Sequence, residues 1–262
     1  MKSKFNEAVT LFQDGELNKA KDICLEVLKI EPNNFDILNL LGVIAFQSKN
    51  YLKSAQIIGK AIQVNSNNPE VYNNHAIALI YLQQFNTALE SLNKAIEINP
   101  NYAEAYNNRG NVLIKIGKAN TALESLNKAI EINPNYAEAY NNRGNVLKKL
   151  NQLEAAVESY SKGIQINSDS GFVLSTLIHT KLMLCDWKSY EKDLEELKNK
   201  ILSGLKVSTA FSILTIYDSL ELQKKAAEIF IKEKFPVINF FGSIFKREPN
   251  KKIRIGYYSA DF

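Results

Sequence analysis

The chain has 262 residues, 32 basic and 28 acidic side chains, a net charge of +4 and two cysteines. This near-balance of charge excludes a strong field for nucleic acid or an anionic membrane. No apolar stretch reaches membrane-span length, and the N-terminal segment is amphipathic with interior charges, unlike a signal peptide. Cys24 and Cys185 lie far apart and near helix-packing positions, which predicts reduced thiols in a cytoplasmic protein, without a disulfide or metal site.

One segment occurs twice, letter for letter, at residues 86–113 and 120–147, an offset of 34. Looser copies with the same period flank it. Five consecutive units then tile residues 1–170: 1–34, 35–68, 69–102, 103–136 and 137–170. A fixed period of this length indicates structural units that each pack on their neighbours, without a single globular core.

Small residues recur in phase and would let two helices of a unit approach closely. Proline recurs at position 32 of three units, where a second helix must stop because proline lacks an N–H and constrains the preceding residue. Position 8 holds Ala8, Gly42, Ala76, Gly110 and Gly144. The pattern resembles the tetratricopeptide repeat (TPR), a helix–turn–helix unit that stacks into a right-handed superhelix. The resemblance implies an all-α fold, an α-solenoid, over residues 1–170.

Three further parts are predicted after the repeats. Residues 171–204 have the length of a degenerate TPR-like helical pair. Residues 205–251 are predicted to be a helical spacer and linker, with helices near 206–217 and 219–234, the second capped by Asp218 or Ser219. Residues 252–262 alternate in polarity, which predicts one terminal β-strand.

Asparagines gather on one face of the first helix in units 3 to 5. At 100° per residue, positions 4, 7, 8 and 11 form the packed stripe, whereas positions 5, 6 and 9 face away from it. Asparagine is a mediocre helix former, so this recurrence needs a reason. The residues are Asn73, Asn74, Asn107, Asn108, Asn111, Asn141, Asn142 and Asn145, with Glu70, Glu104 and Glu138 recurring at position 2.

In a superhelix of this repeat the first helices line the concave surface, so the resemblance implies a ladder of amides along a groove. Each amide offers two donors and an acceptor. Together they could hydrogen-bond the backbone of an extended polypeptide. The alternative is that these asparagines are solvated residues copied by duplication, and spacing alone leaves both interpretations open.

Polar residues also occur at position 7, where this repeat usually has leucine: His75, Arg109 and Arg143. We expect the arginine stems to cover the helix packing and the heads to reach the groove edge. His75 has no second histidine or cysteine nearby for a metal site. Tyrosines at position 4 are predicted to be core, and those closing the turns are predicted to pack: Tyr72, Tyr106 and Tyr140 in the first group, Tyr102 and Tyr136 in the second.

The tail carries a second resemblance. Cys185, Asp186, Trp187 and Tyr190, then a helical spacer and the Lys-Ile-Arg-Ile-Gly-Tyr-x-Ser-x-Asp-Phe strand at 252–262, are similar to the start of the catalytic region of protein O-GlcNAc transferases, including SPINDLY-type enzymes. That family follows its repeats with two Rossmann-like lobes. The resemblance implies a UDP-GlcNAc-dependent glycosyltransferase as the full-length parent.

The asparagine ladder of that family lies at position 6 of its repeats. Asn74, Asn108 and Asn142 match this position, and Asn6 matches it in unit 1. Unit 2 departs from the pattern with Leu40, which puts peptide contacts at the N-terminal end in doubt.

No Gly-rich phosphate loop, metal-ligand cluster or nucleophile–base spacing occurs in the sequence, so no enzyme activity and no cofactor are predicted for this chain. The leading hypothesis is a protein-interaction scaffold that binds protein or peptide in its groove, as the docking region of such a transferase. One alternative is a free-standing TPR scaffold for complex assembly or self-association through the superhelix ends. Another is a clamp for C-terminal carboxylates, which needs basic residues where this groove has Asn and Glu, with Lys115, Lys148 and Lys149 near its edge.

Overall fold

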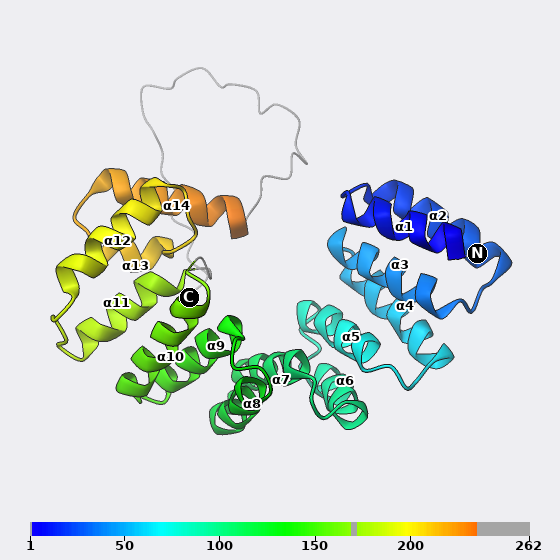
Figure 1. Ribbon diagram of the computed structural model, residues 1–262, viewed down its shortest axis with the longest axis horizontal. Helices are drawn as coiled ribbons and strands as arrows, with labels where there is room; N and C mark the ends of the chain where they lie inside the picture. The colour runs from blue at the N-terminus through cyan, green and yellow to red at the C-terminus, as the bar shows by residue number, and fades with distance from the viewer. Residues whose placement is uncertain (1, 169–171, 235–262) are drawn as a thin grey trace, which may run out of the picture.

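The computed structural model describes residues 2–168 and 172–234, and every regular element there is an α-helix (Figure 1). The predicted strand at 252–262 lies outside the described residues, as does 235–251 of the linker. Ten helices form five consecutive hairpins: α1 (Lys2–Gln13) with α2 (Leu17–Ile30), α3 (Phe35–Gln47) with α4 (Tyr51–Val64), α5 (Pro69–Tyr81) with α6 (Phe85–Ile98), α7 (Ala103–Lys115) with α8 (Ala119–Ile132), and α9 (Ala137–Lys149) with α10 (Leu153–Ile166).

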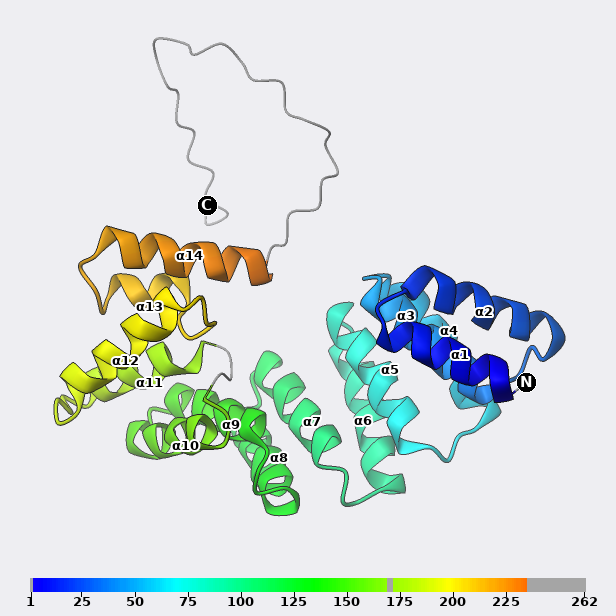
Figure 2. The ribbon, with the colours of Figure 1, turned by 45° about the horizontal axis from the view of Figure 1, so that its top comes forward.

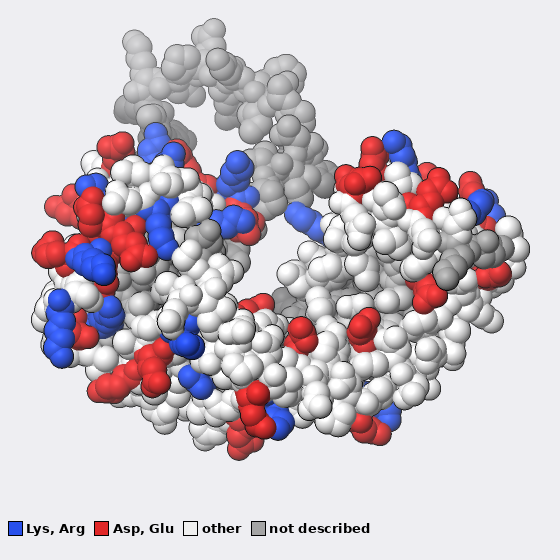
Figure 3. Space-filling model, in the orientation of Figure 1, with Lys and Arg blue, Asp and Glu red and all other residues white. Residues whose placement is uncertain are grey.

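The hairpins stack side by side into an arc that curls around a hollow (Figures 1 and 3). First helices contact one another along the inner side of the arc, as α5 does with α7 and α7 with α9. The second helices α6, α8 and α10 lie on the outer side (Figure 1). Figure 2 shows the two ends of the arc as separate faces, with α1 and α2 at one end and α13 and α14 at the other. The fold is thus an all-helical solenoid whose concave wall is made of first helices.

Each of the five hairpins turns through a residue with positive φ at position 15 of its unit. Two of these residues are glycines, for which this conformation costs little, and three are not. They are Gly15, Lys49, Gln83, Gly117 and Asn151, with φ from 58° to 80°. The next backbone N–H then returns to the first helix, as Gln84 N does to Leu79 O at 2.9 Å. One turn geometry therefore repeats in phase with the sequence period.

Small residues set the distance between the two helices of a hairpin. A Cβ added at Gly110 would lie 2.7 Å from Leu126 Cγ, and one added at Gly144 would lie 2.6 Å from Tyr160 Cδ1. Contacts this short require repacking of the opposite side chain. Position 8 is therefore restricted to alanine or glycine because the second helix covers it directly.

Four helices follow the fifth hairpin: α11 (Val173–Met183), α12 (Tyr190–Leu202), α13 (Ala210–Leu214) and α14 (Leu220–Lys234). Leu174 and Leu197 are buried in their shared core. Helix α13 is shorter than the predicted 206–217, because Thr209 is extended and its hydroxyl caps Ser212 N at 3.1 Å. Cys185 is exposed in the turn after α11, so its expected place near a packing position was wrong, whereas Cys24 is buried.

Candidate functional site

The asparagines at position 5 lie in the wall of the concave face. Asn73, Asn107 and Asn141 are 5%, 0% and 7% exposed. Asn107 Nδ2 donates to Tyr136 OH and to Glu138 Oε1, both at 3.2 Å. Tyr136 ends the same unit at the N-cap of α9, and Glu138 lies in α9 of the next unit, so Asn107 joins two units.

The asparagines at position 6 are half-buried, and their side-chain amides point to the preceding unit. Asn74 Nδ2 donates to Asn39 Oδ1 at 3.3 Å, and Asn108 Nδ2 donates to Asn73 Oδ1 at 2.9 Å. Asn142 Nδ2 donates to Asn107 Oδ1 at 2.9 Å. Each bond uses one of the two amide hydrogens and leaves the other hydrogen and the carbonyl oxygen to hydrogen-bond elsewhere. The result is a row of three amides held in one orientation.

Position 9 is different in units 4 and 5. Asn145 is exposed, and its Oδ1 accepts a hydrogen bond from Tyr160 OH at 2.8 Å. Asn111 is half-buried, and the residue that corresponds to Tyr160 in its unit is Leu126, which has no hydroxyl. The eight predicted asparagines therefore form three groups with different surroundings.

Tyrosines and glutamates lie beside this row. Burial raises the pKa of Tyr102 to about 12, and the carboxylates of Glu104 and Glu70 add to the rise. Burial, Glu138 and Glu104 likewise raise the pKa of Tyr136 well above its usual range. Each hydroxyl is thus close to the carboxylates of two consecutive units. The three glutamates are exposed, and acidic side chains border the hollow in Figure 3.

The polar residues at position 7 bond toward the second helices, so the expected reach of the arginine heads to the groove edge was wrong. Arg109 Nε donates to Ser125 Oγ at 3.1 Å, and its Nη1 donates to Asn93 Oδ1 in α6 at 3.2 Å. The guanidinium also lies 5.0 Å from the centre of the Tyr106 ring. Serine at position 23 draws the head into the joint between units, where hydrogen bonds offset its desolvation.

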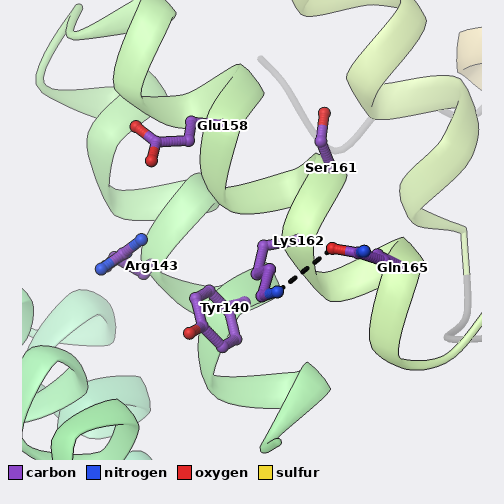
Figure 4. Close-up of a pocket in the computed structure, with 6 residues that line it drawn as sticks. All are labelled: Tyr140, Arg143, Glu158, Ser161, Lys162 and Gln165. Carbon is purple, nitrogen blue, oxygen red and sulfur yellow. Dashed lines mark hydrogen bonds between the residues drawn. The ribbon is translucent and has the colours of Figure 1, made fainter. Parts of the chain in front are cut away.

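Arg143 repeats this geometry one unit later, with Nε donating to Ser159 Oγ at 2.9 Å and Nη1 to Asn127 Oδ1 at 3.4 Å. It borders an open cavity of about 580 Å³ between α9 and α10 (Figure 4). The cavity is lined by side chains of both charges: Tyr140, Arg143, Glu158, Ser161, Lys162 and Gln165. In unit 3, His75 Nδ1 lies 3.0 Å from Ser91 Oγ, and burial lowers its pKa.

Neither a metal-binding cluster nor a membrane-spanning helix occurs among the described residues. They hold no group of three or more His, Cys, Asp or Glu side chains placed to bind a metal ion. None of their helices is long and apolar enough to cross a membrane.

Stacked helical hairpins with a repeated turn and bonds between units define an α-solenoid repeat protein. Residues 76–117 and 110–151 match the family model described as TPR repeat, and residues 137–170 match the model described as tetratricopeptide repeat. Residues 76–170 are therefore tetratricopeptide repeats.

Solved structures of other proteins share this fold. The pilF protein of Pseudomonas aeruginosa is 20% identical with a TM-score of 0.68, over 87% of this chain and 96% of that chain. YrrB is described as a TPR protein with an unusual peptide-binding site. It is 25% identical with a TM-score of 0.56, over 68% of this chain and 90% of that chain. MamA is 24% identical with a TM-score of 0.57, over 62% of this chain and 94% of that chain. Comparison with curated protein sequences gave no match.

Proposed function

We propose that this protein is an interaction scaffold whose concave face binds extended polypeptide. The observation that carries the proposal is the row of half-buried amides of Asn74, Asn108 and Asn142, oriented by bonds to the preceding unit. Each amide retains one N–H and one carbonyl oxygen, which complement the carbonyl and N–H groups of a peptide backbone. Because the amides are already oriented, less side-chain entropy is lost on binding.

The buried asparagines contribute indirectly in this proposal. Asn73 and Asn107 accept the bonds that orient Asn108 and Asn142, so they position the row without contacting peptide. The likeness to YrrB supports the proposal, because that protein of the same fold has a peptide-binding site.

The test is peptide affinity after replacing the three position-6 asparagines by alanine. Peptides that bind are first selected from an array of unstructured sequences. Each lost amide bond is worth about 1 kcal/mol, so N74A/N108A/N142A should bind about 100-fold more weakly. Unchanged affinity in the folded triple variant would refute the proposal.

The chain supplies two matched controls. Asn67, Asn101 and Asn135 recur at the same spacing in the exposed loops between units, so replacing them with alanine should leave affinity unchanged. Replacing Asn39 removes one inter-unit bond but keeps all three position-6 amides. N39A should therefore lower stability while affinity stays within about twofold of wild type.

We further propose that this scaffold is the substrate-docking region of an O-GlcNAc-transferase-like glycosyltransferase. The supporting observation is the tail motif, of which Cys185, Asp186, Trp187 and Tyr190 form a compact turn between α11 and α12. Lys188 N donates to Asp186 Oδ1 at 3.2 Å, and the Trp187 and Tyr190 rings meet edge to face at 5.2 Å. The strand-like part of the motif lies outside the described residues.

Reading the coding sequence past residue 262 tests this second proposal. A long stretch of alternating strand and helix patterns that begins with a histidine-bearing loop is the expected result. A stop codon there would instead favour a free-standing scaffold for complex assembly. The chain by itself should not bind UDP-GlcNAc, which isothermal calorimetry can check. Measurable binding would contradict the proposal that the sugar-nucleotide site belongs to a region beyond residue 262.

A further inference from the structure

Successive second helices of the solenoid are separated by a slot, and position 7 of the intervening first helix points into it. In two slots the side chain is arginine: Arg109 bonds Asn93 in α6 and Ser125 in α8, and Arg143 bonds Asn127 in α8 and Ser159 in α10. These slots are filled by the protein's own polar side chains.

The slot between α4 and α6 holds His75 in the same way. Its Nδ1 lies beside Ser91 Oγ in α6, and a Cβ added at Gly59 in α4 would lie 3.9 Å from its Nε2. Three of the four slots within the five hairpins are therefore occupied by a long polar side chain from position 7.

The remaining slot, between α2 and α4, is apolar and open. Leu25, Leu41 and Ile57 stand here at the positions that hold Asn93, Arg109 and Ser125 two joints along. Leu41 is shorter than arginine and cannot form hydrogen bonds with α2 or α4. A pocket of about 170 Å³ remains, with the buried Leu41 and Ile44 at its floor. Its wall also contains Leu25, Ala45 and Ile57 and the polar residues Asn18, Ser48 and Asn50.

The rim of this α2–α4 pocket is basic. Lys21 in α2 and Lys53 in α4 both line it and are exposed. Neither lysine forms an ion pair within residues 2–168 and 172–234. Leu25 is 39% exposed at the mouth. The pocket thus offers an apolar floor beneath two unpaired positive charges.

We propose that the α2–α4 pocket is a second docking site, which takes one aliphatic or aromatic side chain from an acidic segment of a partner protein. An apolar cavity of about 150 Å³ accommodates a benzene-sized group, so the pocket can take one such side chain. Carboxylates that flank this side chain would complement Lys21 and Lys53. The site lies between second helices, so it is separate from the asparagine row and its partner can bind while the concave face is occupied.

The first experiment is an NMR titration of the methyl groups of Leu25, Leu41, Ile44 and Ile57. The probe is a synthetic pentapeptide with one leucine between two pairs of aspartates, added at millimolar concentration. Saturable shifts of these methyl signals are expected. The same peptide with serine in place of leucine should cause none, and a wild-type protein that shows no shift with the leucine peptide would overturn the proposal.

The matched variant replaces three side chains of the α2–α4 slot by those that fill the slot between α6 and α8. L25N/L41R/I57S reproduces the Asn93, Arg109 and Ser125 arrangement. The introduced arginine should therefore occupy the pocket and lower the affinity for the probe peptide at least tenfold. Circular dichroism checks that the variant is folded. Retained binding by the folded variant would contradict the proposal.

The rim supplies a second test, which applies even if the triple variant does not fold. K21E/K53E leaves the apolar floor intact, and this variant should bind the acidic probe about fivefold more weakly than wild type. It should bind the same peptide with asparagines in place of the aspartates as tightly as wild type does. Equal weakening of both peptides would overturn the role of the lysines. Concentration-dependent dimerisation of the wild type that L25N/L41R/I57S abolishes would show that a second copy occupies the pocket, which also overturns it.

Discussion

The joints between units 3, 4 and 5 and the joint between units 1 and 2 use the same helix arrangement with different chemistry. In the former, asparagine amides join the first helices and arginine joins the second helices. In the latter, Cys24, Val27, Ile37, Leu41 and Ile44 form an apolar cluster. Polar joints fix the orientation of neighbouring units through bonds that only one register satisfies, whereas apolar joints tolerate gaps such as the α2–α4 pocket.

The comparison predicts that units from the polar region are interchangeable and that units from the apolar region are not. Deleting residues 103–136 joins Tyr102 to Ala137 and recreates the eleven residues that originally followed Tyr102. Deleting residues 35–68 has the same length but brings Leu25 to the place of Gly59, opposite His75. The first deletion should give one cooperative unfolding transition with one helix pair fewer, and the second should release the N-terminal hairpin.

Circular dichroism and hydrogen exchange distinguish these outcomes. Loss of protection in α1 and α2 is expected only for the second deletion, and equal behaviour of both deletions would contradict the comparison. The first deletion also removes Asn108, so peptide affinity should fall about fivefold, which is the effect of one amide bond worth about 1 kcal/mol.

Single asparagine substitutions should show the same contrast at smaller scale. Asn107 is fully buried and takes part in three side-chain hydrogen bonds, so N107A should lower the free energy of unfolding by about 3 kcal/mol. Asn39, at the edge of the polar region, has one such bond, and N39A should cost about 1 kcal/mol. Urea denaturation measures both, and equal losses would mean that the polar network adds nothing beyond single bonds.

The two cysteines report on opening of the apolar joint. Cys24 is buried in that joint, and desolvation raises its pKa to about 11, whereas Cys185 is exposed. Because the thiolate is the nucleophile, iodoacetamide at neutral pH should modify Cys24 on the order of 100-fold more slowly than Cys185. Mass spectrometry gives both rates, with C185S to isolate Cys24. Similar rates would show that the joint opens readily.

High pH should weaken the polar joint between units 3 and 4. The pKa of Tyr102 is about 12 in the folded state and about 10 when unfolded, so folding favours the protonated phenol. Its contribution to stability is complete below pH 10 and declines as the pH rises toward 12. Y102F should flatten this decline in denaturation experiments, and an identical pH dependence in both proteins would exclude Tyr102 as its source.

The period of the sequence predicted the helical solenoid because every unit repeats small residues where helices cross. It did not predict the positive φ at position 15, since Lys49 and Gln83 are not residues that mark this conformation. The sequence also did not predict where α13 begins. Its N-cap, the extended Thr209, lies within an apolar pattern that is typical of a longer helix.

The candidate site was predicted only as a helical face. A helical wheel places Asn107 and Asn108 together, but it carries no information on the neighbouring unit that buries one and orients the other. The serines of position 23 were an unused signal. Ser91, Ser125 and Ser159 accompany His75, Arg109 and Arg143, whereas Ile57 accompanies Leu41. That correlation points to a polar contact and explains why the arginine heads turn to the second helices.

The most direct test of the account is the NMR response of the asparagine side-chain amides to a peptide selected from the array. Single Asn→Ala variants assign the amide signals. The account predicts that the signals of Asn74, Asn108 and Asn142 shift and saturate together, while those of Asn67, Asn101 and Asn135 in the loops stay in place. A bound peptide that leaves the three position-6 signals unmoved would contradict the central claim that this row binds polypeptide.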